Sequence, residues 1–66
     1  MNYMIKALVK KLEGEREMAK ANITAYLRNP AGIGEHPEIV EAIESQVEKI
    51  AQAQEKIEIL EEHFPN

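Results

Sequence analysis

The segment that most constrains this chain is the run of nine residues from Asn29 to Pro37, which separates two amphipathic stretches of similar length. It holds two of the three prolines and two of the three glycines. A residue that precedes a proline is disfavoured in the α region, so Asn29 is expected to end the first stretch. Glycine adopts positive φ without strain, and proline suits the first turn of a helix. The segment therefore predicts a reversal between two helices.

The expected fold is all-α, an antiparallel hairpin of two helices in a single domain spanning residues 1–66. Helices are predicted at about 2–28 and 37–63, with a loop at about 29–36. The composition agrees, because every acidic residue is glutamate and aspartate is absent. Glutamate, alanine and lysine are strong helix formers.

The loop is longer than the two to five residues that can join antiparallel helices. We therefore expect it to be ordered, with Gly32 or Gly34 at positive φ and Ile33 packed against helix ends. The alternatives are an exposed Ile33 that anchors another protein, a flexible tether, or a loop that opens into a domain-swapped hairpin. The residues expected to shape the loop are Pro30, Gly32, Ile33, Gly34 and Pro37.

A chain of 66 residues without cysteine can build one small core and no disulfide. In the second stretch, large apolar residues recur every seven positions and are flanked by apolar residues on both sides, which is more surface than one partner helix covers. We therefore predict self-association, most simply of two hairpins into a four-helix bundle. The expected oligomer seam comprises Ile5, Leu8, Leu12, Ile43, Val47, Ile50, Ile57 and Phe64.

Two features of the predicted helices leave alternatives open. Asn22, Gln46 and Gln54 fall within or beside the seam, where they form either a wet margin or a buried polar layer that fixes register and oligomer state. Gly14 lies in the middle of the first helix. It is a tolerated exposed glycine, the point where a neighbouring helix crosses closely, or a position with a ligand or hinge role.

Charge is divided unequally, because residues 1–34 carry a net charge of +3 and residues 35–66 a net charge of −7. A basic helix and an acidic helix attract, and this favours antiparallel pairing within a hairpin. The alternative is that the basic N-terminal segment contacts nucleic acid through Lys6, Lys10 and Lys11. The overall charge of −4 makes nucleic acid the less expected partner.

No constellation for catalysis or metal binding is evident. Ser45 lies in a predicted helix with no histidine one turn away, and the chain has no Glu-x-x-His motif. His36 and His63 would lie roughly 40 Å apart along one helix. We expect no catalytic residue, no cofactor and no metal. No apolar run approaches the roughly 20 residues of a membrane span, so we expect a cytoplasmic protein without a membrane partner.

The segments Leu12-Glu13-Gly14-Glu15 and Tyr26-Leu27-Arg28-Asn29-Pro30-Ala31-Gly32-Ile33-Gly34-Glu35-His36-Pro37-Glu38-Ile39-Val40-Glu41-Ala42 resemble a group of short proteins encoded by tailed phages of aquatic bacteria. The resemblance covers nearly the whole chain and is most specific in the loop. The group has no assigned activity, so it implies only a location in the host cytoplasm or the virion. In architecture, the chain is also similar to the small plasmid-encoded hairpin that dimerises into a four-helix bundle and binds RNA.

The leading hypothesis is a non-enzymatic, homo-oligomeric helical-hairpin protein that acts through contacts with itself or another protein, as an accessory or structural factor of a phage. The alternative is a small dimeric nucleic-acid-binding protein that uses the basic N-terminal segment, with Arg16 as a further candidate contact beside its three lysines.

Overall fold

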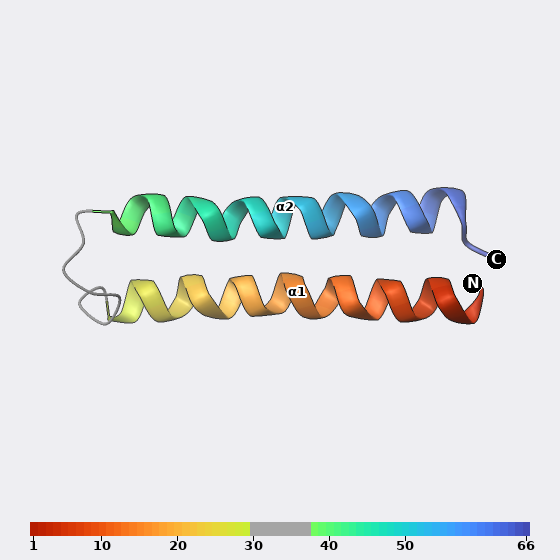
Figure 1. Ribbon diagram of the computed structural model, residues 1–66, viewed down its shortest axis with the longest axis horizontal. Coiled ribbons are helices and arrows are strands. Elements are labelled where there is room, and N and C mark those ends of the chain that lie inside the picture. The colour runs from red at the N-terminus through yellow and green to blue at the C-terminus, as the bar shows by residue number, and fades with distance from the viewer. Residues whose placement is uncertain (30–37) are drawn as a thin grey trace.

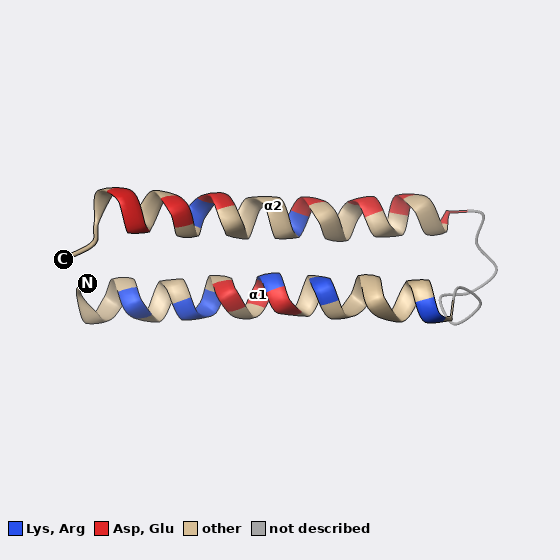
Figure 2. Ribbon diagram, turned by 180° about the vertical axis from the view of Figure 1, so that it is seen from behind, with Lys and Arg blue, Asp and Glu red and all other residues tan. Residues whose placement is uncertain are grey.

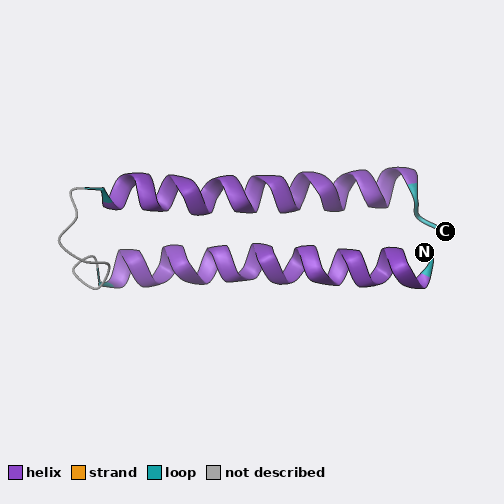
Figure 3. Ribbon diagram, viewed as in Figure 1, coloured by secondary structure: helices purple, strands orange, loops and turns teal. Residues whose placement is uncertain are grey.

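In the computed structural model, the chain forms two helices, α1 (Tyr3–Arg28) and α2 (Ile39–His63). They run antiparallel side by side, and both chain termini lie at the same end (Figures 1 and 3). The structure describes residues 1–29 and 38–66, and this part contains no strand. The predicted all-helical fold with two packed helices is confirmed. The predicted features of the loop residues, Pro30, Gly32, Ile33, Gly34 and Pro37, lie outside the described residues.

A side-chain cap defines the start of α1. The Oδ1 atom of Asn2 accepts hydrogen bonds from the backbone N–H groups of Met4 at 2.7 Å and Ile5 at 3.3 Å. These bonds satisfy two of the donors that the first turn of a helix leaves unpaired. At the other end, Asn29 leaves the helical conformation, with φ −144° and ψ 75°. Its position before Pro30 accounts for this change, because the proline ring disfavours helical backbone at the preceding residue.

The second helix begins two residues later than the predicted position 37. Glu38 precedes its first turn with φ −99° and ψ 21°, and no side-chain capping hydrogen bond forms there. Glu41 lies in the first turn, where the positive end of the helix dipole favours a carboxylate. At the C-terminal end, the backbone N–H of Phe64 donates to the carbonyl of Leu60 at 2.9 Å.

Each helix contacts the other through a single line of residues along its length. Successive residues of this line are alternately four and three positions apart. Toward the chain termini, the line contains the cluster of Val9, Leu12 and Ile57, against which Met1, Ile5 and Leu60 pack. The alternating spacing is the heptad pattern of a coiled coil. The line comprises residues 5, 9, 12, 16, 19, 23 and 26 of α1 and residues 39, 43, 46, 50, 53, 57 and 60 of α2, all buried or partly buried.

The expected oligomer seam and this interhelical line overlap in part. Five of the expected seam residues lie at the interface within the hairpin: Ile5, Leu12, Ile43, Ile50 and Ile57. The other three, Leu8, Val47 and Phe64, remain exposed. Val9 is buried in the core although it was not among the expected seam residues.

Polar side chains join the helices at two points along the line. Asn22 Nδ2 donates to Gln46 Oε1 at 3.1 Å, and Gln46 is only 8% exposed. Nearer the chain termini, Arg16 Nη1 donates to Gln54 Oε1 at 2.9 Å. Gln46 is buried, whereas Asn22 is exposed and Gln54 is partly buried, so these contacts lie at the edge of the line and leave both alternatives open.

Gly14 faces open space in the hairpin. A Cβ atom built at this position has no heavy atom of another part of the chain within 4 Å. Within one hairpin, therefore, Gly14 is an exposed glycine in a helix interior and not a point of close helix crossing.

Replacing Leu12 with Ala should lower the free energy of unfolding by about 2–4 kcal/mol, because Leu12 is only 3% exposed at the centre of the core. The matched control is Leu27→Ala, which removes the same atoms from an exposed site. It should change the free energy by less than about 0.5 kcal/mol. Urea unfolding followed by circular dichroism measures both, and equal effects would contradict the placement of the core.

Gly14→Ala should raise the free energy of unfolding by about 0.5–1 kcal/mol, because alanine has the higher helix propensity and nothing obstructs the added methyl group. The same unfolding experiment measures this change. A destabilised Gly14→Ala variant would show that another helix approaches this glycine in solution.

Candidate functional site

One side of the hairpin carries two adjoining hollows between the helices, which together we call the groove face. The first is lined from Leu8 to Glu15 on α1 and from Lys56 to Leu60 on α2. The second shares Glu15 and Lys56 with the first and continues toward the loop end. The rim comprises Leu8, Lys11, Glu15, Met18, Asn22, Lys49, Gln52, Lys56 and Ile59, and the floor comprises Leu12, Ala19, Ala53 and Leu60.

The groove face exposes large apolar side chains from both helices. Leu8 is 40% exposed, Met18 is 68% exposed and Ile59 is 43% exposed. Ala19 and Ala53 form the floor of the second hollow, and their methyl groups fill little of the space between the helices. The sequence placed Leu8 in the seam but did not single out Met18 or Ile59 as neighbours across the hairpin. Their proximity depends on which sides of the two helices meet.

The charges on the rim are mixed. Lys11 Nζ lies 2.7 Å from Glu15 Oε2. The hydrogen bond that Lys11 donates is the largest cause that lowers the pKa of the Glu15 carboxyl. The positive charge of Lys11 lowers this pKa further, and the charge of Lys56 has a smaller effect in the same direction. Lys49 and Lys56 are the two lysines of α2, and both lie on this rim. The groove face thus surrounds its apolar side chains with three lysines and one glutamate.

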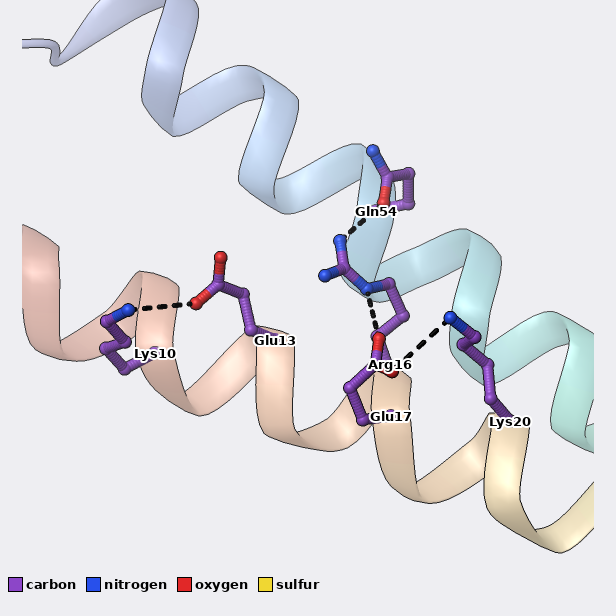
Figure 4. A network of polar contacts seen from close by, with 6 residues as sticks. All are labelled: Lys10, Glu13, Arg16, Glu17, Lys20 and Gln54. Atoms are coloured by element: carbon purple, nitrogen blue, oxygen red, sulfur yellow. Dashed lines mark hydrogen bonds and ion pairs between the residues drawn. The ribbon is translucent and has the colours of Figure 1, made fainter.

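The opposite face of the hairpin carries several ion pairs, which Figure 4 draws from close by. Lys10 Nζ lies 3.5 Å from Glu13 Oε1. Glu17 binds both Arg16 at 3.0 Å and Lys20 at 3.3 Å. Both hydrogen bonds lower the pKa of the Glu17 carboxyl, and the one from Arg16 has the larger effect. This face also exposes the apolar residues Leu27, Val40 and Val47.

The candidate nucleic-acid contacts do not converge on one patch. Lys6 and Lys10 share one side of α1, whereas Lys11 lies on the groove face. Lys10 and Lys11 already pair with Glu13 and Glu15 on their own helix. A phosphate would have to compete with these carboxylates, so the arrangement favours internal pairing over a phosphate-binding surface.

Residues considered for chemistry are dispersed. Ser45 is exposed in the first half of α2, and His63 lies in its last turn, with Nε2 3.7 Å from Glu62 Oε2. His36 lies outside the described residues. Over residues 1–29 and 38–66, no three His, Cys, Asp or Glu side chains come close enough together to hold a metal ion. Neither α1 nor α2 contains a stretch long and apolar enough to cross a lipid bilayer.

Comparison with known proteins gives no relative for this chain: no protein-family model, no curated protein and no solved structure matches it.

The pKa of the Glu15 carboxyl should lie below its ordinary value, and it should rise toward that value in Lys11→Met, which removes the hydrogen bond and the charge. Because folding lowers this pKa, the contribution to stability is present above the unfolded-state pKa. It is lost as the pH falls through the folded-state value. An NMR pH titration of the side-chain carboxyl measures the midpoint, and an unchanged midpoint in Lys11→Met would contradict the pairing.

Proposed function

We propose that this protein is a non-enzymatic helical hairpin that associates with itself and acts through protein–protein contacts. The observation that supports the proposal most directly is the groove face, where Leu8, Met18 and Ile59 expose apolar surface along the junction of the two helices. Exposed apolar surface of this kind marks interaction sites. A second hairpin stacked on this face would complete a four-helix bundle.

The dimensions of the chain support the same proposal. The radius of gyration is 14.8 Å, compared with about 11 Å for a compact domain of this length. The accessible surface is 5042 Å², about 800 Å² more than folded monomers of 7.5 kDa have on average. A thin hairpin of this kind buries too little apolar surface to be robust alone, and a partner supplies the missing burial.

The resemblance to phage-encoded proteins supports an accessory or structural role in a phage, in the host cytoplasm or in the virion. A hairpin that assembles through one face leaves its other surfaces free for a further protein. The exposed residues Leu27, Val40 and Val47 near the loop end are candidates for such a contact.

Nucleic-acid binding through the basic N-terminal segment is the alternative function. The ion pairs of Lys10 and Lys11 with Glu13 and Glu15 weigh against it. Arg16 is also engaged, since it contacts Glu17 and Gln54.

Sedimentation equilibrium between about 1 and 100 µM tests the proposal. Dimers of 15 kDa or larger species should predominate at the upper end of this range, because the 7.5 kDa hairpin needs a second copy to cover its groove face. A gel shift with DNA and RNA at low and at physiological salt tests the alternative, since phosphate contacts weaken steeply with salt. A monomer throughout this range, or a salt-sensitive shift, would contradict the proposed function.

A further inference from the structure

We infer that the groove face binds the groove face of a second copy, with the Arg28 ends of both copies at the same end of the bundle. This inference rests on the proposed self-association and adds the surface and the orientation. In such a dimer, α1 of each copy packs against both its own α2 and α2 of the other copy.

The choice of surface follows from the side chains on the two faces. On the groove face, Leu8, Met18 and Ile59 project beside hollows that an opposing side chain can fill. On the opposite face, Lys10, Glu13, Glu17 and Lys20 form ion pairs that lose their hydration if a second hairpin covers them. The hollows of the groove face and the ion pairs of the opposite face therefore favour the groove face as the surface that a second copy covers.

Symmetry limits how two identical faces can stack with their helices aligned. A two-fold axis parallel to the helices places α1 of one copy on α2 of the other and keeps equivalent ends together. A two-fold axis perpendicular to the helices places α1 on α1 and α2 on α2, and sends equivalent ends to opposite ends of the bundle.

The charges of the helices distinguish these two arrangements. Helix α1 carries six basic and three acidic residues, a net charge of +3, whereas α2 carries two lysines and seven glutamates, a net charge of −5. Figure 2 shows this division of charge between the two helices. With the parallel axis, every helix has oppositely charged helices on both sides. With the perpendicular axis, two helices that each carry a net charge of −5 become neighbours, and like charges repel.

Individual residues of the rim favour the same arrangement. Glu15 and Lys56 line both hollows, so they lie at one level along the hairpin. A two-fold axis parallel to the helices leaves both residues at this level in the second copy. Lys56 of one copy then faces α1 of the other copy, near Glu15 of that α1. A two-fold axis perpendicular to the helices makes the two α2 helices run antiparallel to each other. Lys49 of one copy then lies within about one turn of Lys56 of the other when the helices overlap fully.

Distance measurements between spin labels test the orientation, and the absence of native cysteine makes single-cysteine variants clean probes. Tyr3 is exposed at the open end of α1. In a Tyr3→Cys dimer with a nitroxide on each copy, the labels should lie within about 30 Å, because both copies have this end together. The perpendicular axis would separate them by the length of the helix, about 39 Å or more.

A mixed dimer provides the reciprocal measurement. One copy carries a nitroxide at Tyr3→Cys, and the other carries a gadolinium label at Arg28→Cys. This pair should be separated by about 40 Å, and a distance below about 20 Å would overturn the orientation. Dilution with unlabelled protein should abolish the signal of the Tyr3→Cys dimer, which shows that the distance lies between copies.

Two serine substitutions test the surface. Met18→Ser should raise the dimer dissociation constant at least tenfold, because two copies of Met18 lose their burial in each dimer. The matched control Val47→Ser removes an exposed apolar side chain from the opposite face and should change the constant by less than about threefold. Analytical ultracentrifugation measures both constants.

The outcomes separate the inference from the proposed function. A wild-type chain that stays monomeric and gives no dipolar signal overturns the proposed function itself. A dimer with Tyr3 labels about 40 Å apart overturns the orientation alone. A dimer weakened by Val47→Ser and not by Met18→Ser overturns the choice of surface alone.

Discussion

The structure depends on a single line of contact between two helices. Within residues 1–29 and 38–66, each helix packs against one other helix, and the residues it buries recur at alternating spacings of four and three. The resulting core is small: Val9, Leu12 and Ile57 form its cluster, and Ala19 and Ala53 continue it toward the loop end. The remaining apolar residues of the described helices are partly buried on or beside this line, or are exposed, and the exposed residues Leu8, Met18 and Ile59 contribute to the groove face.

Polar residues occupy part of this one line. Gln46 and Arg16 stand where a stable coiled coil would carry aliphatic side chains, and each bonds to a polar group of the opposite helix. Such contacts fix the register of the helices, because a shift along the line leaves buried polar groups unpaired. They also reduce the apolar area that the hairpin buries. We infer that the line specifies which residues oppose each other, while association supplies further stability.

The hairpin was predictable from local signals. The Pro30 ring explains the end of α1 at Arg28, and helix-forming composition explains the length of both helices. The start of α2 was less predictable, because Glu38 precedes the helix without a side-chain cap that a sequence pattern would reveal.

The sides on which the helices meet could not be derived from either helix alone. Leu8 and Val9 both fall within a turn of Leu12, and only the position of the partner helix decides that Val9 is buried and Leu8 exposed. The same limit applies to the candidate site, where Met18 and Ile59 belong to one face only because α1 and α2 oppose each other in this register. The polar residues beside the seam were evident, but their partners were not.

Thermal unfolding over a hundredfold range of protein concentration tests most directly whether this hairpin depends on a second copy. If folding and association are coupled, the midpoint of unfolding rises with concentration, because mass action favours the associated folded state. The account predicts such a rise, by several degrees between about 2 and 200 µM for a domain of this size. A midpoint that is the same at both concentrations would contradict the account and would show that one line of contact suffices.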